Sequence, residues 1–277
     1  MGNLVIRFAG LYDSVPHHGF AQGNDIKDLG LNSISKANYT VHLVAGDEHR
    51  KNFSLVDISC ITGKRGGGST SKGIELYLPG VHCDVGGSYV EGRGEPIGRI
   101  LVKSPNAAIN LEAERERLIA EGWFKKNEIK IASENLTRSI LLGDAKLLSS
   151  QRDHISNQYS FIPLHIMVDF CKKKGLVIDS DLYKKFKFSD TSFSNAAFLQ
   201  TIEDRLKQYA NGGTRFELEN NQDQTEIDNI KTLRNKYLHW NAFYGEGKGM
   251  MDSVKKVLAQ ANKPNFEKGI RTREVRG

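Results

Sequence analysis

The chain has 277 residues and a mass of 31.0 kDa, enough to bury a sizeable core in one large domain or in one domain plus a smaller one. Its 39% hydrophobic and 26% charged residues are ordinary for a globular protein, and no stretch approaches the roughly 18 apolar residues of a membrane span. The net charge of +6 is concentrated after Ser253, where seven Lys or Arg stand against two Glu. This basic tail favours a solvated, frayed end over contact with an anionic membrane surface, and we expect no nucleic-acid partner.

The N-terminal sequence MGNLVIRF has no basic region followed by an apolar stretch and a cleavage site, so no secretory signal is expected. We therefore expect the protein to be cytoplasmic in the cell that makes it, unless another route exports it. Cys60, Cys83 and Cys171 lie far apart without CxxC spacing, which argues against a zinc site and a disulfide framework. No cofactor and no metal ligand are expected.

Three segments of the first hundred residues are rich in β-branched and aromatic residues and predict strands: residues 4–11, 39–45 and 74–78. Between the first two, residues 25–36 carry apolar residues at rough helical spacing. The alternation of strand, helix and strand is typical of a parallel α/β sheet. Residues 63–73, GKRGGGSTSKG, predict a flexible loop without the residue order of a phosphate-binding loop.

From Ser104 the pattern changes to helices, with Pro105 at a first helical position. Helical periodicity predicts helices over residues 111–121, 160–174, 196–210 and 225–240. The second of these is strongly apolar and predicts a buried helix packed on the sheet. The expected organisation is an α/β domain over residues 1–103 and a helical region with a basic C-terminal tail over residues 104–277.

Two polar clusters follow predicted strands. Asp13 comes after the first strand, and His82 and Asp84 come after the third. Functional side chains of parallel sheets lie at the carboxyl ends of strands, where a His suits a general base and an Asp suits the group that orients it. The order Asp then His also matches the chain order of α/β-hydrolases. A purely structural role, as hydrogen-bonding loop residues, remains open from spacing alone.

Three segments carry a family resemblance: GLYDSV, VHLVAGDEHRKNFSL and ELYLPGVHCDVGGSY. In the same order they resemble the "FDTV", "H.LA.DE.R..F" and "FPGVHSDVGGGY" blocks of the type VI secretion phospholipase effector family, α/β-hydrolases that attack membrane lipids. The blocks span about the first ninety residues, and GVHxDVGG is distinctive. YSFIPLHIM and LRNKYLHW are similar to segments of Bacteroidetes-type relatives, a weaker similarity over most of the chain.

The resemblance implies the C-terminal part of an α/β-hydrolase parallel sheet, followed by a mainly helical region. It implies that Asp13 is the triad acid and His82 the triad base, with Asp84, Gly86 and Gly87 shaping the His loop. It also implies a phospholipid substrate, a secretion-apparatus partner, and delivery to a target cell by type VI secretion.

The nucleophile is the departure from the family. The family's GxSxG elbow precedes the Asp block by several tens of residues, and no GxSxG occurs in this sequence; the nearest match, around Ser69, fails at its last position. We therefore expect a fragment that contributes the acid and the base, and that is inactive without a missing N-terminal part, since removing a triad serine typically costs about a millionfold in rate. The alternative is a non-catalytic remnant that acts as a binding protein.

Other polar residues suggest weaker hypotheses. A metal site is a minor alternative, because histidines and carboxylates could gather at one sheet edge but show no HExxH or HxH spacing: Asp13, His17, His18, His42, Asp47, His49, His82 and Asp84. His42 lies inside a predicted strand, which favours a core histidine with satisfied hydrogen bonds. Residues 47–50 predict an ion-paired turn that positions the Asp loop, and His239 is expected to close a helix.

Overall fold

The computed structural model describes residues 4–16, 30–103, 110–134, 145–188, 193, 195–243, 263–267 and 270–276. The fold is mixed α/β, as expected, and its first sheet has four strands in the order β1-β2-β5-β4. Strands β1 (Ala9–Tyr12), β2 (Thr40–Ala45) and β5 (Gly73–Leu78) run parallel, and β4 (Gly68–Thr70) is antiparallel to β5. The three parallel strands end at the same edge of the sheet.

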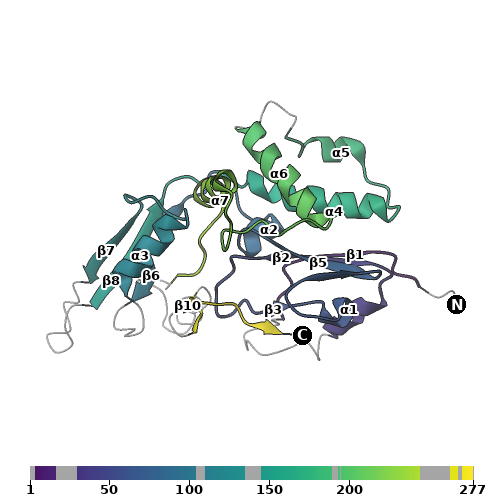
Figure 1. The fold of residues 1–277 in the computed structure, drawn as a ribbon, viewed down its shortest axis with the longest axis horizontal. Coiled ribbons are helices and arrows are strands. Elements are labelled where there is room, and N and C mark those ends of the chain that lie inside the picture. Colours follow the sequence, from purple (N-terminus) through teal and green to yellow (C-terminus); the bar gives the residue numbers. More distant parts are fainter. Residues whose placement is uncertain are drawn as a thin grey trace, which may run out of the picture.

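Helices cover one face of this sheet, and Figure 1 shows α4 (Phe161–Lys173) and α6 (Ala196–Ala210) above it with α1 (Ser59–Thr62) and β3 (Leu55–Val56) below. Helix α4 (Phe161–Lys173) is the predicted apolar helix, and it packs on the central strand β2. A Cβ on Gly10 of β1 would lie 2.8 Å from the sulfur of Met167, so glycine is what allows this close approach. The prediction of a buried helix on the sheet is confirmed.

The other predicted helices are also present. They are α3 (Leu111–Ala120), α6 (Ala196–Ala210) and α7 (Gln224–Tyr237), with a short helix α5 (Ser180–Lys184) between α4 and α6. Helix α3 ends at Ala120, and Gly122 follows with a φ of +84°, a left-handed conformation that favours glycine. Helix α7 begins after Asp223, whose carboxylate accepts the amides of Thr225 and Glu226. Two short 3₁₀ helices complete the set: η1 (Leu31–Lys36) and η2 (Gln158–Ser160).

A second sheet makes the expectation of a mainly helical region after residue 104 incomplete. Strands β6 (Glu95–Lys103), β8 (Ala145–Arg152) and β7 (Ile129–Glu134) form an antiparallel sheet in that order. Its strands mix apolar and polar residues: Leu101, Ile129, Leu147 and Leu148 are buried, while serines and lysines occupy other positions of the same strands. That mixture hides the strand pattern. The division at residue 103 stays a prediction, and β6 pairs across it with β8.

Several local predictions need correction. The first strand begins at Ala9, and Leu4, Val5 and Ile6 before it are exposed. The predicted loop at 63–73 contains β4, which pairs with β5. Of the predicted helix at 25–36, the described part is the 3₁₀ helix η1; residues 25–29 and the expected helix start at 104–105 lie outside the described residues. Among the described helices, none is both long enough and apolar enough to span a bilayer.

The C-terminal segment corrects the expectation of a frayed tail. Strands β9 (Phe266–Glu267) and β10 (Ile270–Arg271) pair with each other, and β11 (Val275–Arg276) pairs in parallel with β3. Arg271 is buried and bonded to Glu114 at 2.9 Å. The described part of the tail, residues 263–267 and 270–276, is therefore bound to the body of the protein; Lys255, Lys256 and Lys268 lie outside the described residues.

Candidate active site

The carboxyl edge of the parallel strands brings two predicted site residues together. Asp13 follows β1 and His82 follows β5, and His82 Nδ1 lies 2.8 Å from Asp13 Oδ2. Strand β2 lies between β1 and β5, so the two loops meet above its end. This is the arrangement of an acid and a base in a hydrolytic triad, and the catalytic roles of both residues stay a prediction.

Asp13 is held in an unusual backbone conformation. Its φ is +47°, in the left-handed region that non-glycine residues rarely adopt. Such strain costs on the order of 1–3 kcal/mol and persists where surrounding contacts enforce it. The Asp13 amide donates to the Leu43 carbonyl at 2.8 Å, and its Oδ1 accepts the Ala45 amide at 2.9 Å. Strand β2 thus fixes both the backbone and the carboxylate of Asp13.

Arg273 is a site residue that the sequence did not reveal. Its Nη1 donates to Asp13 Oδ1 at 2.6 Å and its Nη2 to Oδ2 at 2.9 Å, while its Nε donates to the Phe53 carbonyl at 2.7 Å. Burial alone would raise the pKa of Asp13, but the Arg273 charge and the hydrogen bonds from His82 and Arg273 lower that pKa to about 2. Asp13 is therefore ionised at neutral pH.

His82 is oriented by its neighbours and stays accessible. Because Asp13 is ionised, His82 Nδ1 is the donor of the 2.8 Å bond, and its Nε2 has no hydrogen-bond partner among the described residues. The side chain is 30% exposed, and its ring meets the Phe53 ring edge-on at 5.4 Å. A neutral imidazole with an accessible Nε2 lone pair can accept a proton from a substrate or a nucleophile.

The turn after β2 is ion-paired, as predicted, but it holds the His loop instead of the Asp loop. Asp47 Oδ2 accepts the Gly80 amide at 2.7 Å, and Glu48 Oε2 accepts the His82 amide at 3.2 Å. Glu48 is buried and bonded by the Arg50 guanidinium at 2.9 and 3.0 Å. Burial opposes ionisation, but the bonds and charge of Arg50 hold the pKa of Glu48 below its usual value.

Asp84 ties the His loop to the segment after α7. Its Oδ2 accepts the amides of Val81 and His239, both at 3.0 Å, and its Oδ1 lies 2.8 Å from His239 Nδ1. Burial raises the pKa of Asp84, against the effect of these bonds. The loop is the short helix α2 (His82–Gly86), which ends at Gly87 with a φ of +71°. A Cβ on Gly86 would meet open space, and nothing in the structure explains a glycine there.

His42 is the satisfied core histidine that the sequence predicts. It is buried, its Nδ1 lies 3.0 Å from Glu75 Oε2, and its Nε2 accepts the Ser14 amide at 3.1 Å. His17 and His18 lie outside the described residues. Within the described part of the chain, no three His, Cys, Asp or Glu side chains are grouped as metal ligands.

The described residues thus form a mixed α/β protein in which an ionised Asp contacts an accessible His at the carboxyl edge of a parallel sheet. The sequence comparison is more specific: residues 2–110 match the family model described as type VI secretion system phospholipase effector Tle1-like, catalytic domain. The similarity to this family covers residues 2–110, less than half of the chain. The family resemblance of the three motifs is thus confirmed.

A solved structure has a similar fold over nearly the whole chain. It is described as the Tle1 effector bound to the VgrG spike from the type 6 secretion system, and it matches with a TM-score of 0.58 at 17% sequence identity. The match covers 98% of this chain and 58% of that effector chain, so this chain spans little more than half of the effector's length. The comparison with curated proteins gives no match.

Proposed function

We propose that this chain is part of a phospholipase-type antibacterial effector, a lipid ester hydrolase, to which it contributes Asp13 as triad acid and His82 as triad base. The observation that carries the proposal is the 2.8 Å contact between His82 Nδ1 and an ionised, fully buried Asp13. The match of residues 2–110 to a phospholipase effector family supports a lipid substrate.

In the proposed reaction, His82 Nε2 takes the proton of a serine hydroxyl as the serine oxygen bonds to the ester carbonyl carbon. Asp13 keeps the Nδ1–H tautomer and stabilises the imidazolium that forms. The imidazolium then gives its proton to the departing alcohol as the ester bond breaks, which leaves an acyl-enzyme. In a second step His82 takes a proton from water as the water oxygen bonds to the acyl carbon. The bond between the acyl group and the serine oxygen then breaks, His82 returns the proton to that oxygen, and the fatty acid leaves.

We propose that the serine comes from sequence outside these residues, because no GxSxG motif is present among them. Strand β1 supports this proposal: it lies at the edge of its sheet, and no described strand pairs with its other side. Leu4, Val5 and Ile6, just before it, are 93%, 60% and 48% exposed. An open edge beside exposed apolar residues favours the addition of further strands. The chain alone should not hydrolyse lipid.

The test is complementation. The chain is co-expressed with the GxSxG-bearing segment of a related effector, and fatty-acid release from phospholipid vesicles is measured. Activity should require both parts and should be lost in His82→Ala and Asp13→Asn. His154→Ala is the matched control, since that side chain is 68% exposed and remote in sequence from the pair. Equal activity of His82→Ala and the unaltered chain would refute the assignment of the base.

The second candidate is a binding role in the secretion apparatus. The structurally similar effector is described in complex with a VgrG spike, and we propose that this chain also binds a spike protein and is delivered by type VI secretion. Biolayer interferometry with the spike protein of the same genome tests this. Binding that survives His82→Ala, without hydrolysis in any complementation, would favour the non-catalytic remnant. Arg271 and Arg273 bond to the internal carboxylates of Glu114 and Asp13. These two arginines therefore do not support a contact between the tail and a membrane.

A further inference from the structure

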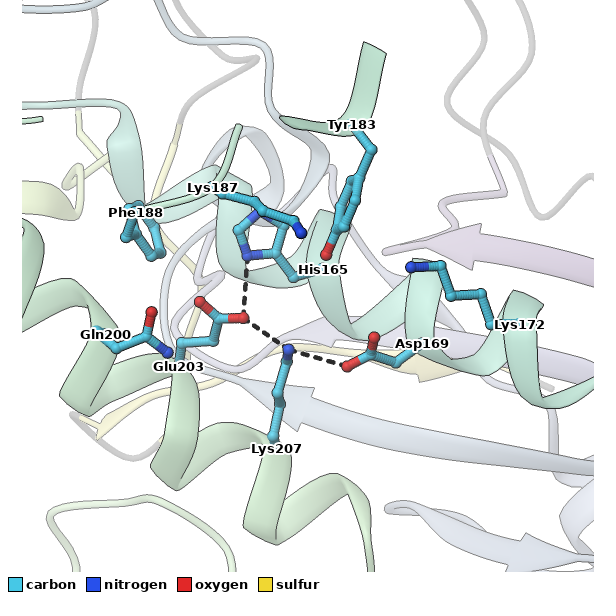
Figure 2. A pocket seen from close by; sticks show the side chains of 9 residues that line it. All are labelled: His165, Asp169, Lys172, Tyr183, Lys187, Phe188, Gln200, Glu203 and Lys207. Carbon is cyan, nitrogen blue, oxygen red and sulfur yellow. Dashed lines mark ion pairs between the residues drawn. The ribbon is translucent and has the colours of Figure 1, made fainter. Parts of the chain in front are cut away.

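A polar cavity lies among the helices, and its lining shares no residue with the Asp13–His82 site. It has a volume of about 250 Å³ and opens between α4, α5 and α6 (Figure 2). Its lining combines basic, acidic and aromatic side chains: His165, Asp169, Lys172, Tyr183, Lys187, Phe188, Gln200, Glu203 and Lys207. The proposed hydrolytic reaction uses none of them.

Both carboxylates of the cavity form ion pairs with one lysine, Lys207. Lys207 Nζ lies 2.7 Å from Glu203 Oε1 and 2.9 Å from Asp169 Oδ2, and Figure 2 shows it pointing between them. Although burial opposes it, hydrogen bonds to Glu203 and Asp169 raise the pKa of Lys207. The lining therefore carries three lysines against two carboxylates, a small excess of positive charge, and both carboxylates lie at Lys207.

Lys172 and Lys187 converge on Tyr183 from two sides. Their ammonium nitrogens lie 4.8 and 5.4 Å from the centre of the Tyr183 ring. Among the described residues, neither makes an ion pair with a carboxylate. Burial raises the pKa of Tyr183, so its hydroxyl keeps its proton and remains a hydrogen-bond donor. Two ammonium groups without carboxylate partners beside one ring form a positively charged position that an anion can join.

His165 adds a buried polar atom without a partner to the same space. Its side chain is 2% exposed, and its ring packs edge-on against Tyr183 and Phe188. Nδ1 lies 3.1 Å from Glu203 Oε1 without hydrogen-bond alignment, and Nε2 has no hydrogen-bond partner among the described residues. Buried polar atoms are nearly always paired, so an unpaired one that lines a cavity indicates a ligand.

We propose that this cavity binds a phosphate group, held by Lys172 and Lys187, with the Tyr183 hydroxyl as a further donor and His165 Nε2 as the unpaired atom of the lining that contacts it. A phosphate offers oxygens in a tetrahedral arrangement, which suits donors that converge from different helices better than a planar carboxylate does. The source is either a soluble phosphate ester or the headgroup of a phospholipid, which share this chemistry. The proposal is independent of the hydrolytic function.

Calorimetric titration of the full chain with inorganic phosphate and with glycerol 3-phosphate, at neutral pH and low salt, tests the site. We expect saturable binding that is at least about tenfold weaker in the Lys172→Gln, Lys187→Gln double variant. Both side chains are exposed, so the fold should survive. Lys184→Gln is the matched control on α5, because Lys184 is bonded to Asp181 outside the cavity. Absence of saturable binding, or equal affinity in the double variant, would overturn the proposal.

Vesicles distinguish the two sources. Co-sedimentation with phosphatidylglycerol vesicles that is lost in the double variant, and competed by glycerol 3-phosphate, supports a lipid headgroup. Binding of soluble phosphate without vesicle binding supports a soluble ester. His165→Asn should also weaken the affinity for phosphate, and the melting temperature of that variant reports whether it folds. Vesicle binding that persists unchanged in the double variant, with no soluble binding, assigns the effect to another surface and refutes the site.

Discussion

Two histidine–carboxylate pairs belong to the region of the first sheet, one inside it and one at its carboxyl edge. The distances between ring nitrogen and carboxylate oxygen are nearly the same in the two pairs. His82 Nδ1 is 2.8 Å from Asp13, and His42 Nδ1 is 3.0 Å from Glu75. The difference lies at the other ring nitrogen. His42 Nε2 accepts the Ser14 amide inside the sheet, whereas His82 Nε2 has no such partner among the described residues, and its side chain is 30% exposed.

The carboxylates of the two pairs, Glu75 and Asp13, also differ in the contacts that they make. Glu75 also accepts the amides of Ile58 and Gly67, so it joins three segments of backbone around a sealed histidine. Asp13 accepts an arginine and one amide, and it directs an accessible histidine at the edge of the sheet. A short His–carboxylate contact therefore does not mark a catalytic pair by itself. A general base also needs an accessible second nitrogen, because that atom exchanges the proton with a substrate, and only His82 of the two has one.

The largest expected effect is on activity, and it concerns the Asp13–His82 pair. In the complemented enzyme, His82→Ala should lower phospholipid hydrolysis by at least about ten-thousandfold, because the base of a triad is lost. The melting temperature of the chain should change little, since the His82 side chain is partly exposed. Fatty-acid release and thermal unfolding measure the two quantities. An active His82→Ala enzyme would show that His82 is not the base and that its accessible nitrogen has no role in the reaction.

The second effect is on the free energy of unfolding, and it concerns the His42–Glu75 pair. His42→Leu removes the partner of Glu75 and leaves a buried carboxylate with only its amide donors, which should lower the free energy of unfolding by about 3–5 kcal/mol. Urea denaturation of the isolated chain measures this loss. The exposed His154→Leu is the control and should change the free energy of unfolding by less than about 0.5 kcal/mol. A His42→Leu chain as stable as the control would mean that the buried pair is not structural.

The contact between Asp13 and His82 could be anticipated from the sequence because it depends on strand order. Both residues directly follow apolar strands, and parallel strands place their carboxyl ends at one edge. The long helices were predictable for a similar reason, since α4 and α6 carry their apolar residues at regular helical spacing. The core role of His42 followed from its place inside a strand.

Other parts of the site depend on contacts distant in sequence, and these had no local signal. Arg273 lies 260 residues from Asp13, within a basic tail whose composition resembles a solvated end. The turn at residues 47–50 was recognised as ion-paired, but which loop it supports depends on the pairing of β2 with β5. The strands β7 and β8 were missed because polar residues occupy much of their sequence, and tertiary packing outweighs that local pattern.

The third effect tests how Asp13 is held. Arg273→Gln removes a bidentate ion pair from a fully buried carboxylate and should lower the free energy of unfolding by about 3 kcal/mol. Arg276→Gln is the matched control from the same segment, because Arg276 pairs with the half-exposed Glu274 and should matter by less than about 1 kcal/mol. Urea denaturation compares the two variants. If the two variants lose the same free energy of unfolding, the loss comes from disturbing the C-terminal segment and not from removing the Asp13 contact.

The smallest effect is a pH dependence that belongs to Asp13. Its pKa falls from the usual 3.8 to about 2 on folding, so its ionised form contributes roughly 2 kcal/mol of stability above about pH 4. That contribution is lost as the pH falls from about 4 to 2, because the unfolded chain takes up the proton first. Urea denaturation of the unaltered chain and of Asp13→Asn between pH 5 and pH 2 measures it. Glu48, Glu114 and Glu203 also have lowered pKa values, but they titrate in both proteins and cancel in the difference. The stability difference between the two proteins should therefore shrink across this window, and a constant difference would show that the Arg273–Asp13–His82 contacts do not favour the charged carboxylate.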